Sequence, residues 1–252
     1  MPLIIPDWPA PERVRAFSTV RSGGYSPFPY HGSRSDRGGL NVGLHVGDDP
    51  EKVRLNRAKL RRYLPSEPVW LNQVHGSVVV DAARVGGVPD ADASYTRQNN
   101  VVCAVMTADC LPVLFCTADG KTVAAAHAGW RGLASGVLEK TIEAMRPDEN
   151  SRVLAWLGPA IGPENFEVGE DVLTVFAEKN AQTVDAFVEK RDVPGKYLAN
   201  IYLLATRILA KAGVSDIFGG RFCTVSDKKR FYSYRRDGVT GRMATGIWIA
   251  AE

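Results

Sequence analysis

Three apolar runs in the middle of the chain constrain its fold more than any other feature. They span Val101 to Met106, Pro112 to Cys116 and Thr122 to Ala126, and Asp119-Gly120 gives a turn signal between the second and the third. Apolar runs of this length, bounded by turn residues, predict buried strands. The fold is therefore expected to contain a central sheet that includes all three.

Polar residues stand at the ends of these runs. Asp109 and Cys110 follow the first run, and His127 follows the third. His75, in the string N-Q-V-H-G, stands at the end of another expected strand. A thiol and imidazoles at the ends of buried strands can meet at one edge of a sheet, where rigid scaffolds commonly present reactive groups.

These donors allow three interpretations. Two histidines and a cysteine with one open position form a known catalytic zinc set, because neutral imidazole and thiolate suit zinc and the vacancy admits water or substrate. Cys110 as a nucleophile with His127 as its base would form a cysteine-hydrolase pair. Histidines that serve only structural hydrogen bonds are the third possibility. His31 and His45 have weaker claims to a functional role than His75.

Patterns elsewhere predict a mixture of strands and helices. Further strands are expected at residues 14–19, 69–74, 77–80 and 152–157, near Phe222, and at 246–250. Helices are expected at 50–63, capped by Asp49, and at 134–145, 170–178 and 198–212. Residues 21–39 are expected to form a long loop, either a lid or a mobile connection. The predicted fold class is α+β, a single domain of residues 1–252 with mixed β-sheets flanked by helices in a layered α/β/β/α sandwich.

Composition narrows the possible partners. The net charge is +3 and the arginines are scattered, which favours small anionic ligands over nucleic acid. No apolar run approaches the roughly 18 residues of a membrane span, and the first residues do not resemble a signal peptide, so a cytoplasmic location is expected. The four cysteines contain no C-x-x-C, so disulfides are not expected. Cys103, Cys116 and Cys223 are expected to be buried small hydrophobic residues.

Several long strings in the sequence resemble one known family. They are T-V-R-S-G-G-Y-S, W-L-N-Q-V-H-G, T-A-D-C-L-P-V-L, A-A-A-H-A-G-W-R-G, W-L-G-P-A-I-G-P, F-E-V-G-E-D-V, F-Y-S-Y-R-R and G-R-M-A, which span nearly the whole chain. Together they are similar to the YfiH-type laccase-domain family, also called polyphenol oxidase or peptidoglycan editing factor, whose members are described as purine nucleoside phosphorylases. One departure is the loop Tyr30–Gly39, which is longer here.

The resemblance implies a zinc ion bound by His75, Cys110 and His127. It implies phosphorolysis of adenosine, inosine, guanosine and methylthioadenosine, with adenosine deamination as a second activity. The implied partners are a purine nucleoside and phosphate, without nucleic acid or membrane, and the implied state is a monomer or weak homo-oligomer. The alternative is a metal or Cys–His hydrolase that edits peptidoglycan precursors.

Donor counts limit the other labels of the family. A multicopper oxidase needs a blue copper and a trinuclear cluster, which require many more than the four histidines of this chain. A single copper in the His2Cys site could still oxidise phenols slowly in vitro. The deaminase strings H-x-E and P-C-x-x-C are absent, so deamination would need another layout.

Phosphate binding directs attention to arginine, whose planar guanidinium binds phosphate with two parallel hydrogen bonds. The arginine candidates are Arg21, Arg57, Arg131, Arg235, Arg236 and Arg242. Arg131 lies four residues after His127 and is predicted to reach back over the open coordination position. Asp109 is either a general acid or base or a group that positions a ligand. Tyr232 and Tyr234 either stack on a base or belong to the core. The predicted catalytic residues are Cys110, Asp109 and Arg131, and the predicted substrate-binding residues are Asn41, His45, Arg57, Gln73, Tyr234 and Arg235.

Overall fold

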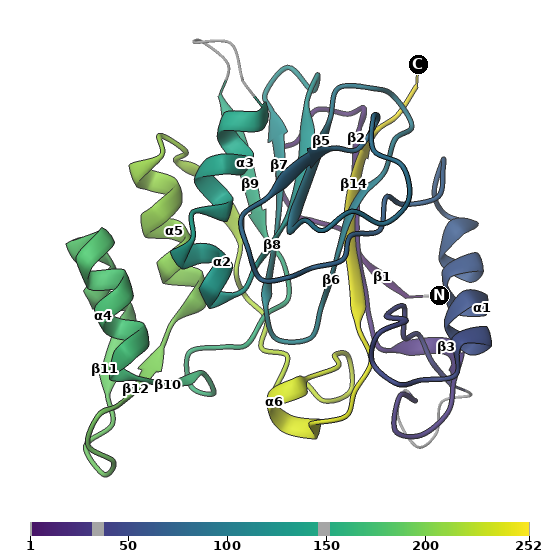
Figure 1. Cartoon of the computed structure of the whole chain (residues 1–252). Helices are drawn as coiled ribbons and strands as arrows, with labels where there is room; N and C mark the ends of the chain where they lie inside the picture. The colour runs from purple at the N-terminus through teal and green to yellow at the C-terminus, as the bar shows by residue number, and fades with distance from the viewer. Residues whose placement is uncertain (1, 32–37, 146–151, 252) are drawn as a thin grey trace.

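A computed structural model describes residues 2–31, 38–145 and 152–251 of the chain. Its centre consists of two sheets that pack face to face (Figure 1). The six-stranded sheet has the order β13-β9-β7-β8-β5-β4, and the four-stranded sheet has the order β1-β2-β14-β6. The six strands of the first sheet are β4 (Val79–Asp81), β5 (Ala93–Thr96), β7 (Leu111–Thr117), β8 (Val123–Ala128), β9 (Val153–Leu157) and β13 (Asp216–Gly219). The four strands of the second are β1 (Leu3–Ile4), β2 (Val14–Thr19), β6 (Cys103–Thr107) and β14 (Met243–Ile249).

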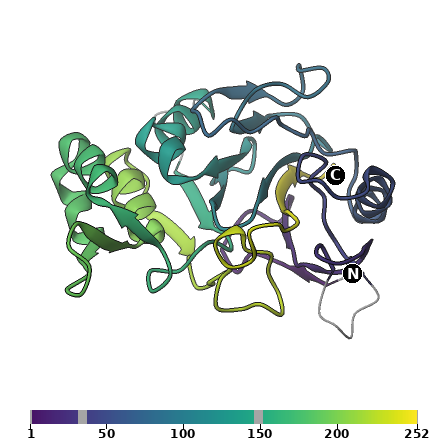
Figure 2. The ribbon, with the colours of Figure 1, turned by 60° about the horizontal axis from the view of Figure 1, so that its bottom comes forward.

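Helices cover the outer faces of this pair of sheets. On the six-stranded sheet lie α2 (Trp130–Ala134), α3 (Val137–Met145) and α5 (Ile201–Lys211), and beside the four-stranded sheet lie α1 (Pro50–Arg61) and the short strand β3 (Ser22–Ser26). A smaller sheet of β10 (Glu167–Gly169), β12 (Lys196–Ala199) and β11 (Phe187–Glu189) projects to one side with α4 (Glu170–Lys179) and the 3-10 helix η1 (Ala181–Ala186), as Figure 2 shows. The short helix α6 (Tyr234–Asp237) precedes β14. This arrangement confirms the predicted α+β class and its layers.

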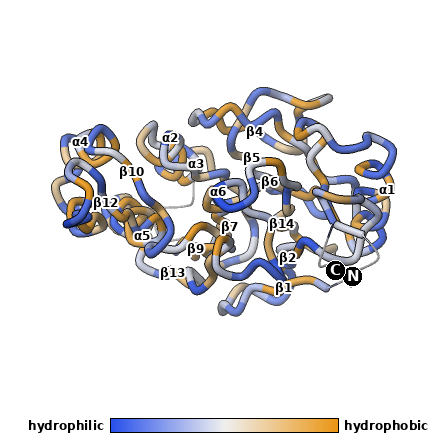
Figure 3. Tube along the Cα trace, turned by 90° about the horizontal axis from the view of Figure 1, so that it is seen from below, coloured by the Kyte–Doolittle hydropathy of each residue, from blue (hydrophilic) through white to orange (hydrophobic). Residues whose placement is uncertain are grey.

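Alternating side chains on β7 explain why the two sheets stack. Val113 and Phe115 pack toward the helices, whereas Leu114 and Cys116 pack toward the four-stranded sheet. All four are fully buried. Figure 3 shows hydrophobic residues gathered along these central strands. Because both faces are covered, the strands read as continuous apolar runs, and this is why they could be predicted.

Local signals account for the ends of two helices. Asp49 caps α1 by accepting a hydrogen bond from Glu51 N at 2.9 Å, as predicted, and the helix ends at Arg61. Asn200 accepts from Leu203 N and starts α5, so the predicted helix over 198–212 loses its first residues to β12. In the part of the chain that the structure describes, no helix is long and apolar enough to cross a membrane.

Other predicted elements are wrong. Residues 69–74 form only isolated bridges, and no strand contains Phe222. The helix predicted over 134–145 is two helices, because Gly136 has φ 85° and breaks the helical path. The loop predicted over 21–39 contains β3, and its residues 32–37 lie outside the described part. Strands β5, β10, β11, β12 and β13 were not predicted, because each is only three or four residues long.

Candidate metal centre and active site

His75, Cys110 and His127 come together at the ends of the central strands β7 and β8 of the six-stranded sheet. One ligand atom from each lies within 4.8 Å of the others. Cys110 Sγ is 3.9 Å from His75 Nε2, and the two imidazole rings meet edge to face at a centroid distance of 4.8 Å. The register of β7 with β8 pairs Leu111 with Ala128, so Cys110 must lie beside the end of β8. The predicted meeting of thiol and imidazole is confirmed.

The backbone around these donors is unusual in three places. His75 has φ 60° and Asp109 has φ 91°, a left-handed region that non-glycine residues rarely adopt. Strain of this kind concentrates where the surrounding structure fixes a functional group. A Cβ on Gly129 would lie 3.0 Å from Cys110 Sγ and 3.3 Å from the His75 ring. The glycine of the string H-A-G-W is therefore required for the donors to approach each other.

A buried carboxylate that the sequence did not reveal holds both histidines. Asp92, which is fully buried, accepts from His127 Nδ1 at 2.8 Å, from His75 N at 3.0 Å and from Gly76 N at 2.7 Å. Because Nδ1 of His127 carries the proton in this contact, its Nε2 is left to face the other donors. The only feature of the sequence that could have indicated Asp92 is its position between Ala91 and Ala93, at the start of a strand.

The three donors alter each other's protonation. Burial alone would raise the pKa of Cys110, but His127 and His75 outweigh it and lower it to about 6. Burial alone would lower the pKa of His127, but the Cys110 thiolate and Asp92 raise it to about 9. In contrast, burial raises the pKa of both Cys103 and Cys116 to about 12. Cys110 therefore has far more thiolate character than Cys103 or Cys116, and both a metal ligand and a nucleophile require that character.

The donor chemistry fits one metal ion. Two imidazoles and a thiolate suit zinc or copper, and the carboxylate behind His127 is the outer partner that such ligands usually have. Among the described residues this is the single group of three or more such donors. A multicopper cluster does not fit a chain with four histidines.

Two pockets meet at the donor group and share His75, Ala108, Cys110 and Tyr234. We call the first the aromatic pocket; its other lining residues are Asp109, Trp130, Arg131, Ile161, Phe166, Ile201 and Arg235. We call the second the polar pocket; its other lining residues are His45, Gln73, Met106, Thr107, His127 and Arg242. The middle of a ligand that occupied both pockets would therefore lie against the donor residues.

Comparisons with known proteins identify the family. A family described as multi-copper polyphenol oxidoreductase laccase matches residues 15–250. The chain belongs to this family. The protein of Escherichia coli (strain K12) named purine nucleoside phosphorylase YfiH is 51% identical over 253 residues, with 98% of each chain covered. A Pseudomonas aeruginosa protein, also named a purine nucleoside phosphorylase, is 50% identical over 246 residues with the same coverage.

Solved structures agree with this assignment. A Neisseria meningitidis protein is similar to this chain with a TM-score of 0.90 and 49% identity, covering 99% of each chain. The hypothetical protein YfiH of Bacillus licheniformis is similar with a TM-score of 0.83 and 29% identity, covering 94% of this chain and 92% of that one. The resemblance inferred from the strings is therefore confirmed.

Asp109 makes three contacts in this laccase-family site. Its Oδ1 accepts from Thr224 Oγ1 at 2.5 Å, and its Oδ2 accepts from Ser233 Oγ at 3.1 Å and Arg235 N at 2.7 Å. These contacts tie the segment that carries Cys110 to the two loops that follow β13. They favour the alternative in which Asp109 positions a ligand over the one in which it transfers protons.

Some predicted substrate-binding residues lie away from both pockets. Asn41 is fully buried and uses its amide to hold Asp48, Gly43 and the backbone of Arg242. Arg57 lies over the Trp70 ring at 4.1 Å and donates to Val42 O. Both support the polar pocket from behind. The other four predicted residues do line a pocket: His45, Gln73, Tyr234 and Arg235. The side-chain amide of Gln73, however, is hydrogen-bonded to the backbone N–H and carbonyl of Met106.

The arginine candidates separate into two groups. Arg21 and Arg236 donate to backbone carbonyls of neighbouring loops and line neither pocket. Arg131 is exposed and lies over the Trp130 ring at 4.3 Å, at the start of α2. It lines the aromatic pocket, together with His75 and Cys110.

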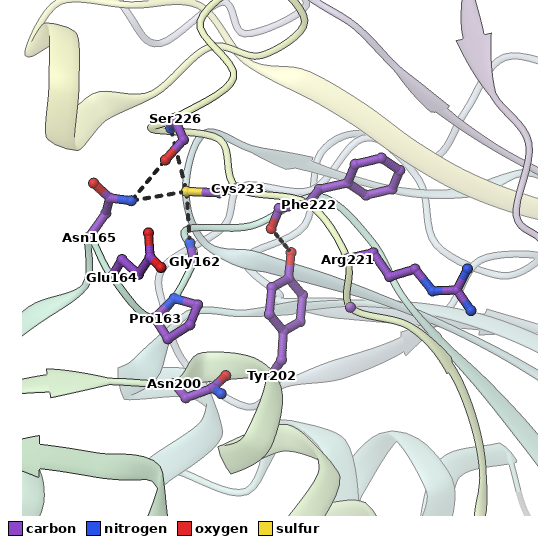
Figure 4. Close-up of a pocket in the computed structure, with 11 residues that line it drawn as sticks. Gly162, Pro163, Glu164, Asn165, Asn200, Tyr202, Arg221, Phe222, Cys223 and Ser226 are labelled. Atoms are coloured by element: carbon purple, nitrogen blue, oxygen red, sulfur yellow. Dashed lines mark hydrogen bonds between the residues drawn. The ribbon is translucent and has the colours of Figure 1, made fainter.

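A separate cavity, lined in part by the loop that follows β9, surrounds Cys223 (Figure 4). Its Sγ accepts hydrogen bonds from Gly162 N at 3.2 Å, Asn165 Nδ2 at 3.3 Å and Ser226 N at 3.4 Å. Cys223 is half-buried, so it is not the fully buried hydrophobic residue that the sequence predicted. All four cysteines are free thiols, as expected.

Proposed function

We propose that this chain is a zinc-dependent purine nucleoside phosphorylase acting on adenosine, inosine, guanosine and methylthioadenosine. The observation that carries the proposal is the position of the His75, Cys110 and His127 donors between an aromatic and a polar pocket. The enzyme name borne by relatives at 51% and 50% identity supports it.

The residues of the two pockets suit the two substrates. Trp130, Phe166 and Tyr234 offer aromatic surface on which a flat purine base can stack. Arg131, Arg235 and Arg242 supply guanidinium groups suited to phosphate. A bound zinc ion would act as a Lewis acid that polarises an oxygen of a ligand.

Protein groups in this proposal bind and orient the reactants. Asp92 fixes the orientation of His127 and of the backbone at His75, and Asp109 fixes the segment that carries Cys110. Such positioning lowers the entropic cost of bringing two substrates together. Four free thiols accord with a cytoplasmic location.

The names of the relatives favour phosphorolysis over the alternatives of peptidoglycan-precursor editing and adenosine deamination. Slow phenol oxidation would remain a side activity of copper-loaded protein, since copper also accepts this donor set.

The proposal is tested with a panel of nucleosides. Purified protein should contain about one zinc ion per chain, measured by elemental analysis, and should release the free base from inosine when phosphate is present. Cys110→Ala should lose both the metal and the reaction. Base release by the metal-free variant at the rate of the parent would contradict the proposal.

A further inference from the structure

Arg242 enters the polar pocket from a firmly held stretch of backbone. Its N–H donates to Asn41 Oδ1 at 2.8 Å, and its carbonyl accepts from Val42 N at 3.2 Å. Asn41 is buried and donates in turn to Asp48 Oδ2 at 2.9 Å. A Cβ on Gly43 would lie 2.8 Å from Arg242 Cγ, so the glycine makes room for the aliphatic part of the side chain. The direction of this side chain is therefore set without a ligand.

The guanidinium of Arg242 interacts with neutral groups. Its Nη1 donates to the carbonyls of Thr240 and Gly241, each at 3.1 Å, and within the described residues no ion pair joins it to a carboxylate. Burial lowers its pKa, but a guanidinium stays charged at neutral pH. Cys110 and Asp109 act on this charge from nearby, but neither forms an ion pair with it among the described residues, so an anion entering the pocket can bind the guanidinium directly.

The other two arginines of the site differ from Arg242. Arg235 directs its guanidinium to the carbonyls of Asn165 and Glu167, and Arg131 lies over the Trp130 ring. Both line the aromatic pocket. Arg242 alone, of the three, lines the polar pocket, together with His45 and Thr107.

We propose that Arg242 binds the phosphate co-substrate in the polar pocket, while the purine base occupies the aromatic pocket on the other side of Cys110. This inference rests on the proposed function and assigns its two substrates to separate pockets. The sugar would then lie at the wall that the pockets share, beside His75, Cys110 and Tyr234.

This placement suits a displacement at the sugar. An oxygen of hydrogen phosphate forms a bond to C1′ while the bond from C1′ to N9 breaks. The electron pair of that bond leaves on the base, which takes up the proton that hydrogen phosphate brought. The products are ribose 1-phosphate and the free purine. In such a displacement the nucleophile approaches C1′ from the face opposite the leaving group. Phosphate in the polar pocket and the base in the aromatic pocket would lie on these two opposite faces.

The test compares Arg242→Gln and Arg242→Lys with Arg131→Gln. Inorganic phosphate is titrated into each protein by calorimetry, with and without hypoxanthine to occupy the aromatic pocket, and zinc content is measured in parallel. Loss of hydrogen bonds to a charged group should weaken phosphate binding about tenfold or more in Arg242→Gln and less in Arg242→Lys. Zinc content and hypoxanthine affinity should stay as in the parent, and Arg131→Gln should weaken phosphate binding much less than Arg242→Gln does.

Unchanged phosphate affinity in Arg242→Gln would overturn the inference, and so would a parent protein that binds no phosphate. A loss confined to Arg131→Gln would transfer the role to Arg131. The proposed function is checked separately by the products: if phosphate binds through Arg242 yet inosine is not converted to ribose 1-phosphate, the function fails while the anion site stands.

Discussion

The donors and the rim of this site are built in opposite ways. His127 belongs to a buried strand, Cys110 adjoins another, and a fully buried Asp92 fixes the two histidines. The rim residues Arg131 and Tyr234 start short helices and are exposed, Tyr234 to 62%. The donors are held in a single geometry before any ligand binds. The rim side chains, in contrast, can change conformation when a ligand binds.

This difference indicates a division of labour. Changes among the donors should act on metal affinity and on every later step, because these groups share hydrogen bonds and a single geometry. Changes on the rim should act on one substrate at a time, because each side chain there makes few contacts with its neighbours.

Removing a donor should have the largest effect. Cys110→Ala is expected to lose most of its zinc and to reduce turnover by more than the roughly 10–100-fold that follows loss of an outer partner. Elemental analysis and inosine turnover measure the two effects. Cys223→Ala is the matched control, because its thiol lines a separate cavity. Full metal occupancy in Cys110→Ala would show that the donor group is assigned wrongly.

Asp92→Asn should weaken metal binding by about 10–100-fold, since the amide cannot hold both His127 Nδ1 and the backbone N–H groups as a carboxylate does. Competition with a chelator measures this affinity. Asp90→Asn, two residues away and exposed, should bind metal as the parent does. Equal affinities for the two variants would mean that the donors need no buried support.

Gly129→Ala tests how closely the donors must approach. The added methyl group would meet Cys110 Sγ and the His75 ring at 3.0 and 3.3 Å, so one donor must move by a few tenths of an ångström. We expect a several-fold loss of metal affinity with a small loss of thermal stability. Gly86→Ala, which meets nothing within 4 Å, is the control. A variant with unaltered affinity would show that the donor geometry tolerates displacement.

Tyr234→Ala should have the smallest effect and should spare the metal. Loss of one aromatic contact with a base costs about 1–3 kcal/mol, so the KM for inosine should rise about fivefold or more while zinc content and phosphate KM stay constant. Tyr63→Ala, also exposed but lining neither pocket, serves as the control. A change in the zinc content of Tyr234→Ala would contradict the proposed difference between the donors and the rim.

The sequence predicted the donors better than their surroundings. Continuous apolar runs identified β6, β7 and β8 because these strands are buried on both faces, and reactive residues at their ends are visible in the same stretch. Asp92 was missed because a buried carboxylate has no periodic signature. Asn41 and Arg57 were predicted to bind substrate, yet tertiary contacts direct their side chains behind the pocket.

The role of arginines could not be predicted for a similar reason. Sequence proximity to His127 indicated Arg131, which lines the aromatic pocket and lies over the Trp130 ring. Arg242 lies more than a hundred residues from the donors and reaches the pocket only because β14 pairs with β6.

The most direct test of this account is the fate of the sugar. Inosine is incubated with zinc-loaded protein in buffers with and without orthophosphate, and the sugar products are separated and quantified. We expect hypoxanthine and ribose 1-phosphate in equal amounts when phosphate is present, and almost no cleavage when it is absent. Free ribose formed at the same rate in both buffers would mean that water is the nucleophile, and the assignment as a phosphorylase would be wrong.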